Sequence, residues 1–159
     1  QQVDVIADAH ARLAVLVMGT SDLAKEMRVP HRTDRLGFLY ALSRVVTAAR
    51  VAGLDVIDGV YLDLQDAEGF AAICEQGCAL GFDGKSLIHP NQIAVANRVF
   101  APDAEAVNQA QRLLACWLEA EKAGEGVAVL DGKLVENLHA AEAERILALA
   151  EAITRRDST

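Results

Sequence analysis

The chain has 159 residues, of which 52% are hydrophobic and 24% are charged, and its formal net charge is −8. This is the composition of a globular domain large enough to bury a core. The acidic balance excludes a protein whose main partner is DNA or RNA, because it leaves no broad basic surface. No apolar run approaches the roughly 20 residues of a membrane span, and no signal peptide is visible.

The three cysteines, Cys74, Cys78 and Cys116, lack the pattern of a disulfide framework or a zinc site. We expect buried free thiols, which suit a reducing cytoplasm, and a small molecule or a protein as partner. The first residue, Gln1, falls in a helix-like stretch. This favours a fragment, or the ordered part of a longer chain.

Helices alternate with short apolar strands. The expected elements are, in order, a helix over 3–11, a strand over 13–18, a helix over 34–52, a strand over 56–62, a helix over 66–80, a strand within 81–88, a helix that starts at Pro90, a helix over 102–123, a strand over 127–130 and a helix over 138–153. Asp34 is the expected N-cap of the long helix that Gly53 ends. The alternation predicts an α/β protein with a parallel sheet. Three clear βα units make either a small open domain or part of a (β/α)8 barrel, which typically needs about 250 residues.

Polar clusters follow the first three predicted strands, at the strand ends where active sites of parallel α/β folds collect. Their members are Asp22 in the first cluster, Asp63 and Asp66 in the second, and Asp83, Lys85, His89, Asn91 and Gln92 in the third. Three of them have a structural alternative: Asp22 caps the short helix that follows it, Asp66 is an N-cap, and His89 hydrogen-bonds a turn. The residues alone therefore predict an α/β domain with carboxylates at its strand ends, suited to magnesium.

The stretch GFDGKSLIHPNQI, residues 81–93, resembles a signature of the citrate lyase β-subunit family of HpcH/HpaI-type aldolases, which also holds malyl-CoA, β-methylmalyl-CoA and citramalyl-CoA lyases. Three further blocks agree in order: GTSDLA, VIDGVYLDLQDAEGF and GVAVLDGKLVENLH. The resemblance covers essentially the whole chain but only the C-terminal part of the family's usual length. It implies a partial (β/α)8 TIM barrel over 1–101 and a helical extension and lid over 102–159.

The resemblance also implies an activity. Members of this family are magnesium-dependent carbon–carbon lyases that cleave or form a 3-hydroxyacyl-CoA, giving an acyl thioester and a small oxo acid. Asp22 matches the family's metal-binding aspartate, whereas the partner glutamate and the active-site arginine fall upstream of Gln1. Magnesium suits this chemistry because it prefers oxygen ligands and keeps positions open for substrate.

Glu136 aligns with a lid aspartate that, in many relatives, a neighbouring subunit donates for the acid/base step. A glutamate there is a departure from the family, and the structural alternative is a residue favoured by the helix dipole. The resemblance implies a homotrimer or hexamer with lid exchange. The glycine-flanked segment after Gly124 would act as the lid, and the helix over 138–153 carries an apolar face that needs cover. The members of that face are Leu138, Ala141, Ile146, Leu149 and Ala150.

Four residues are candidates for contact with substrate: Asp63, Lys85, His89 and Asn91. For the last three the alternative is that they brace the barrel mouth, which we favour for His89 and Asn91. Two functional alternatives to the lyase remain: an acyl-CoA thioesterase on the same scaffold, and a subunit that binds acyl-CoA or an acyl carrier and is not a lyase by itself.

Overall fold

The structure is a computed structural model, and it describes residues 2–158. The chain divides into two compact units, the first ending at Phe100 and the second beginning at Ala101. Within residues 2–158, every helix is too short or too polar to span a bilayer.

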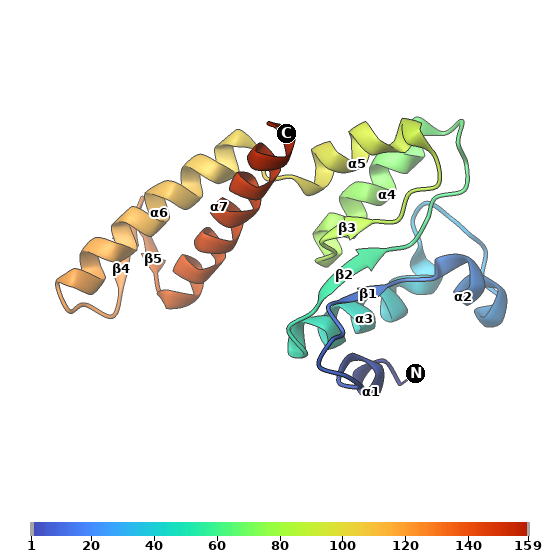
Figure 1. The fold of residues 1–159 in the computed structure, drawn as a ribbon, viewed down its shortest axis with the longest axis horizontal. Helices are drawn as coiled ribbons and strands as arrows, with labels where there is room; N and C mark the ends of the chain where they lie inside the picture. The colour runs from blue at the N-terminus through green and yellow to red at the C-terminus, as the bar shows by residue number, and fades with distance from the viewer. Residues whose placement is uncertain (1, 159) are drawn as a thin grey trace. The chain divides into compact units, whose positions relative to one another are not determined.

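The first unit is a mixed α/β unit built on a parallel sheet with the strand order β1-β2-β3 (Figure 1). Its elements are α1 (Val3–Ala7), β1 (Val15–Val17), α2 (Thr20–Met27), the 3-10 turn η1 (Leu36–Phe38), α3 (Leu39–Val51), β2 (Asp55–Asp58), α4 (Ala67–Leu80), β3 (Gly84–Lys85), the 3-10 turn η2 (Pro90–Gln92) and α5 (Ile93–Phe100). The predicted α/β class with a parallel sheet is confirmed, and the sheet is open over the residues described.

The sheet buries only one of its faces. Successive side chains of a strand point to opposite faces, and Leu16 of β1 and Val56 of β2 pack in the core against Leu42 of α3. On the other face of β1, Val15 and Val17 are 39% and 61% exposed. The helices therefore cover one side of the sheet and leave an apolar surface on the other.

The predicted helix over 34–52 begins differently in the structure. Arg35 adopts a left-handed conformation with φ 50°, η1 follows, and the N-cap of α3 is Phe38. The prediction of Asp34 as the N-cap of the long helix is therefore wrong, although its Oδ1 accepts a hydrogen bond from the N–H of Leu36 at 3.1 Å. The chain turns at Arg35 because the guanidinium of this residue enters the core, where it pairs with Asp58.

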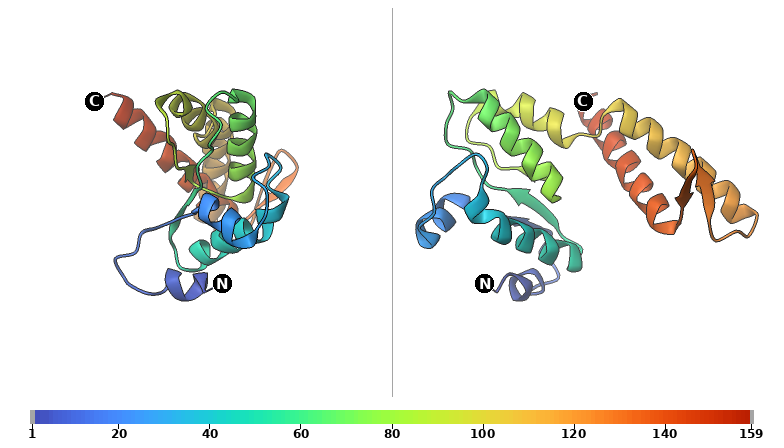
Figure 2. Two further views of the ribbon diagram at one scale, coloured as in Figure 1. Left: turned by 90° about the vertical axis from the view of Figure 1, so that its right-hand side faces the viewer. Right: turned by 180° about the vertical axis from the view of Figure 1, so that it is seen from behind.

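The second unit contains α6 (Ala104–Lys122), β4 (Ala128–Leu130), β5 (Lys133–Val135) and α7 (Asn137–Asp157). Helices α6 and α7 pack side by side, and the antiparallel β4–β5 hairpin lies at one end of the pair (Figure 2). The sequence did not predict β5. The Asp131-Gly132 turn that joins the two strands has φ 51° and 75°, which is typical of the tight turn of a two-residue hairpin.

The core of the second unit forms around Trp117 of α6. Ala140 and Ala143 of α7 are buried. Leu138, Ala141 and Leu149, which we predicted on the apolar face of this helix, are exposed within the unit. The small alanines face α6 because two helices approach closely only where side chains are short, and the larger residues remain uncovered.

Candidate functional site

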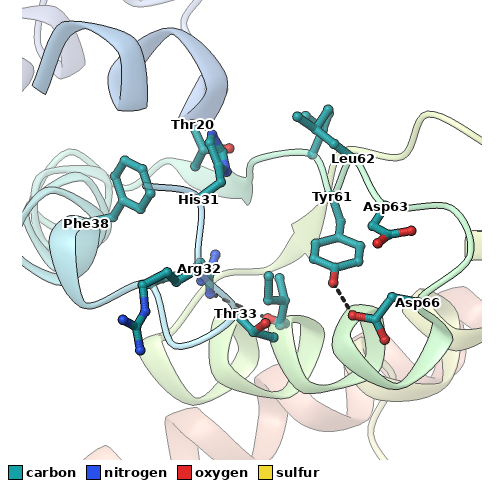
Figure 3. Close-up of a pocket in the computed structure, with 12 residues that line it drawn as sticks. Thr20, His31, Arg32, Thr33, Phe38, Tyr61, Leu62, Asp63 and Asp66 are labelled. Carbon is teal, nitrogen blue, oxygen red and sulfur yellow. Dashed lines mark hydrogen bonds between the residues drawn. The ribbon is translucent and has the colours of Figure 1, made fainter. Parts of the chain in front are cut away.

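A cavity of about 320 Å³ lies where β1 and β2 end. Ligands of open parallel sheets bind at this carboxyl edge. The lining residues come from the start of α2, from the segment before α3, from the segment after β2 and from α4 (Figure 3): Thr20, His31, Arg32, Thr33, Arg35, Phe38, Val60, Tyr61, Leu62, Asp63, Asp66 and Ile73.

Thr20 gives this cavity an unsatisfied polar group. The residue is 4% exposed, and its Oγ1 is buried without a hydrogen-bond partner among the described residues. It is the first residue of α2, whose N-cap is Gly19, so no side chain caps the helix. The first N–H groups of a helix have no partner within the helix and favour a negative charge. The start of α2 can therefore donate to an oxygen atom of a ligand.

Asp22 lies in the first turn of α2, and its side chain is exposed. The alternative in which Asp22 caps this helix is wrong, because Gly19 occupies the N-cap position. Among the residues described, no group of three or more His, Cys, Asp and Glu side chains is arranged to hold a metal ion. Asp22 thus offers one exposed carboxylate in the same turn of α2 as Thr20, and its role as a magnesium ligand stays a prediction.

The segment after β2 forms one wall of the cavity. Asp63 is exposed, and its Oδ1 accepts a hydrogen bond from the N–H of Gln65 at 2.9 Å. The hydroxyl of Tyr61 points toward Asp66 and donates to its Oδ2 at 2.6 Å (Figure 3). Asp66 also accepts from the N–H of Gly69 at 2.8 Å as the N-cap of α4, which confirms the predicted cap. These contacts hold the wall to the start of α4.

Beneath the cavity lies a buried cluster of three charged side chains from different elements. Arg35 Nη1 donates to both carboxylate oxygens of Asp58, at 2.8 and 2.6 Å. Lys85 Nζ lies 3.0 Å from Asp58 Oδ2. The side-chain exposures of Arg35, Asp58 and Lys85 are 5%, 0% and 1%. Burial lowers the pKa of Lys85, and the carboxylate of Asp58 opposes that shift. Lys85 therefore lies inside the unit, and of these three residues only Arg35 lines the cavity.

The turn after β3 supports the same wall. His89 Nδ1 accepts from the N–H of Asn91 at 3.2 Å, so it caps η2. Asn91 Nδ2 donates to the carbonyl of Leu64 at 3.3 Å. The buried Gln92 donates to the carbonyl of Tyr61 at 3.1 Å. The exposed His89 and Asn91 thus contact backbone in this structure, and their contact with substrate stays a prediction.

In the second unit, Glu136 is the N-cap of α7. Its carboxylate accepts from the backbone N–H of His139, and the His139 imidazole Nδ1 accepts from the backbone N–H of Glu136 at 3.0 Å. The structural alternative for Glu136 is thus present. An acid/base role would require the carboxylate to leave this cap.

Sequence reasoning missed three residues of the site: Thr20, Arg35 and Asp58. The local sequence could have indicated that Asp58 has a buried partner of opposite charge, because its carboxylate lies within the apolar run over 56–60. The partners themselves lie far away along the chain.

The hydrogen bond between Tyr61 and Asp66, together with burial, raises the pKa of Tyr61 from 10.0 to about 12. The folded protein holds this proton more tightly than the unfolded chain does. The resulting stability is therefore complete below about pH 10 and is lost as the pH rises toward 12. In a Tyr40→Phe variant, which leaves Tyr61 as the one tyrosine, we expect ultraviolet titration of the phenol to show a midpoint near pH 12.

Adding Asp66→Asn to that variant removes the charge and keeps a side chain that caps helices well. The midpoint should then move down toward 10. An unchanged midpoint would show that the bond to Asp66 does not control Tyr61.

Comparison with known proteins identifies relatives over most of the chain. The model of the HpcH/HpaI aldolase/citrate lyase family matches residues 1–90. A (3S)-malyl-CoA thioesterase of Cereibacter sphaeroides is 52% identical over 145 residues, which make up 91% of this chain and 51% of the relative. The citrate lyase subunit beta of Leuconostoc mesenteroides subsp. cremoris is 37% identical over 147 residues, 92% of this chain and 49% of the relative.

A solved structure is similar as well. The protein CitE from Mycobacterium tuberculosis, in complex with magnesium, acetoacetate and coenzyme A, aligns with a TM-score of 0.75 and 28% identity. The alignment covers 94% of this chain and 56% of the CitE chain. The chain spans about half the length of the curated relatives that it matches.

Proposed function

The chain belongs to the HpcH/HpaI aldolase/citrate lyase family, and we propose that it forms part of a magnesium-dependent enzyme that cleaves a 3-hydroxyacyl-CoA thioester at a carbon–carbon bond. One observation carries this proposal: at the uncapped start of α2, Thr20 lines a cavity at the carboxyl edge of the sheet, and its buried hydroxyl has no partner among the described residues. Hydrogen-bond donors fixed at such a place stabilise negative charge that develops on a substrate oxygen. An acyl-CoA and a small oxo acid are the corresponding substrates and products.

Asp22 is the residue that would hold magnesium. Its exposed carboxylate is an oxygen donor of the kind that this hard cation prefers, and magnesium often takes only one or two protein carboxylates. Bound there with water and substrate oxygens, the ion would stabilise negative charge on the oxygen of the cleaving bond. The hydroxyl of Thr20 and the first N–H groups of α2 would donate hydrogen bonds to the same substrate oxygen. Asp63 and the buried Lys85 are the other polar side chains at these strand ends.

The uncovered face of the sheet supports a larger fold around this site. Strand β1 pairs only with β2 among the described residues, and its outer face exposes Val15 and Val17. A free strand edge beside an apolar face invites further strands. We infer that the sheet continues as a (β/α)8 barrel of which the first unit supplies a part. The half-length coverage of the relatives supports the same inference.

A second candidate is hydrolysis of the thioester, favoured by the 52% identity to a (3S)-malyl-CoA thioesterase. Product analysis with (3S)-malyl-CoA and magnesium distinguishes the two reactions in the intact enzyme. Carbon–carbon cleavage releases acetyl-CoA and a two-carbon oxo acid, whereas hydrolysis releases free CoA, which a thiol reagent detects, and malate. Binding of acyl-CoA without either product would leave a nonlyase binding subunit as the function.

We also propose that the enzyme is a homotrimer or hexamer in which Glu136 reaches the active site of a neighbouring subunit. The exposed Leu138, Ala141 and Leu149 of α7 support this proposal, because a second copy could cover them. Glu136 would then supply the proton that the acyl-CoA enolate needs after cleavage, and its cap with His139 would have to open.

Mixing two inactive variants of the intact enzyme, Asp22→Ala and Glu136→Ala, tests this exchange. Shared sites should recover about a quarter of the activity on statistical grounds, because each mixed interface can pair one intact Asp22 with one intact Glu136. No recovery, with subunit exchange confirmed by mass spectrometry of labelled copies, would exclude the shared site.

A further inference from the structure

The backbone of Gly59 lies at the end of β2 and is held from both sides by buried charges. Its N–H donates to Asp58 Oδ1 at 2.8 Å, and its carbonyl oxygen accepts from Lys85 Nζ at 2.5 Å. The side chains of Asp58 and Lys85 are almost fully shielded from water. Charge-assisted hydrogen bonds in such surroundings are strong and directional. Together they fix the orientation of this peptide.

Asp58 is in turn held by Arg35, which has further partners on α4. Arg35 Nε donates to Gln76 Oε1 at 2.5 Å, and Nη2 donates to the carbonyl of Ile73 at 3.4 Å. A Cβ atom on Gly77 would lie 2.9 Å from Asp58 Oδ2, so the helix backbone closes over the carboxylate. The position of Asp58 therefore depends on α4 as well as on β2.

Gly59 contacts Thr20 directly. A Cβ atom on Gly59 would lie 2.3 Å from Thr20 Oγ1, 2.6 Å from its Cγ2 and 2.9 Å from the carbonyl oxygen of Met18. The glycine backbone therefore occupies the space behind the Thr20 side chain and limits where the hydroxyl can lie. The Thr20 hydroxyl is buried and has no hydrogen-bond partner among the described residues. Thr20 itself lines the cavity.

We propose that Arg35, Asp58 and Lys85 are positioning residues, which hold Gly59 against Thr20 and thereby aim the Thr20 hydroxyl at a carboxylate or carbonyl oxygen of the substrate. The proposal rests on the proposed function for its site and goes further in giving the buried cluster a role in turnover. A donor displaced by about 1 Å costs on the order of 100-fold in rate. Loosening Gly59 should therefore lower activity by more than the loss of stability alone explains.

A double-mutant cycle in the intact enzyme tests this link. Thr20→Val removes the hydroxyl and keeps the shape of the side chain, and we expect it to lower kcat/KM for (3S)-malyl-CoA about 10- to 100-fold. Lys85→Met, which frees the carbonyl of Gly59, should lower it by a similar factor. The double variant should be within about 2-fold of Thr20→Val, because both changes act through one hydroxyl.

Arg50→Met is the matched control. Arg50 makes a two-bond ion pair with Asp83 and donates to the carbonyl of Gly81. These bonds also join α3 to the β3 region, but at the start of the strand, away from the cavity. This variant should lower the melting temperature, and its kcat/KM should stay within about 2-fold of wild type.

The outcomes separate the two proposals. If the losses of kcat/KM from Thr20→Val and Lys85→Met multiply in the double variant, the positioning role is overturned, whereas the proposed site at Thr20 is not affected. If Thr20→Val retains full activity, the proposed site at this cavity fails, and the positioning role fails with it. Should Lys85→Met not fold, Lys85→Gln takes its place, because its shorter amide loses the reach to the Gly59 carbonyl but leaves a polar group beside Asp58. Its loss should be absent in the Thr20→Val background, and a multiplied loss again overturns the role.

Discussion

Replacing Asp58 with alanine is expected to destabilise the protein by about 3–5 kcal/mol, because it leaves the guanidinium of Arg35 and the ammonium of Lys85 buried without their shared carboxylate. This is a large fraction of the roughly 5–15 kcal/mol that keeps a domain folded. Urea unfolding at constant pH, followed by circular dichroism, measures the free energy of unfolding for wild type and variant.

The size of this loss should depend on pH. Burial lowers the pKa of Lys85, and the carboxylate of Asp58 opposes that shift in the wild type. In Asp58→Ala the opposition is gone, so Lys85 in the folded variant binds its proton more weakly than in the unfolded chain. The variant therefore gains stability as the pH rises, and its deficit relative to wild type should be smaller at about pH 9 than at about pH 6.

Asp83→Ala is the control for this experiment. Asp83 pairs with Arg50, and the two side chains are 25% and 45% exposed, so solvent screens the pair. Its Oδ2 also accepts from the N–H of Val56 at 2.7 Å, and the expected loss is about 1–2 kcal/mol. Equal losses for Asp58→Ala and Asp83→Ala would contradict the idea that burial makes the Asp58 cluster critical.

Asp22→Ala in the intact enzyme is expected to lower kcat by about 100-fold or more and to weaken the dependence of the rate on magnesium. The reason is that, in the proposed site, the variant would lose the carboxylate that holds magnesium, whose charge would stabilise the transition state. Because Asp22 is exposed on α2, its removal should leave the free energy of unfolding within about 0.5 kcal/mol of wild type. Rates at increasing magnesium concentration and calorimetric titration of the ion measure the effect.

Glu26→Ala provides a carboxylate control on the same helix. Glu26 is also exposed, and it lies in the last turn of α2 rather than the first. It should bind magnesium and turn over substrate as wild type does. Equal magnesium affinity in wild type and Asp22→Ala would remove Asp22 from the metal site.

The sequence by itself determined features that depend on neighbouring residues. The order of most helices and strands followed from apolar periodicity. Asp66 was predicted as an N-cap from its residue type before a helix, and its carboxylate accepts from the N–H three residues later. The family followed from the stretch over 81–93 and the blocks that agree with it in order. The β4–β5 hairpin also has a local signal, Asp131-Gly132, and could have been predicted.

Only the tertiary structure decided which polar residues meet. Arg35 and Lys85 converge on Asp58 from 23 and 27 residues away, and the local bond from the N–H of Leu36 to Asp34 at the turn of Arg35 gives no sign of that contact. Sequence placed Lys85 among strand-end groups, but the packing of α4 and α5 against β3 buries its ammonium inside the unit. The close approach of Gly59 to the Thr20 hydroxyl, which has no partner among the described residues, is likewise a tertiary contact. Such contacts depend on how the helices and strands pack. A buried charge is stable only beside a partner of opposite charge, and that partner can lie at any distance along the chain.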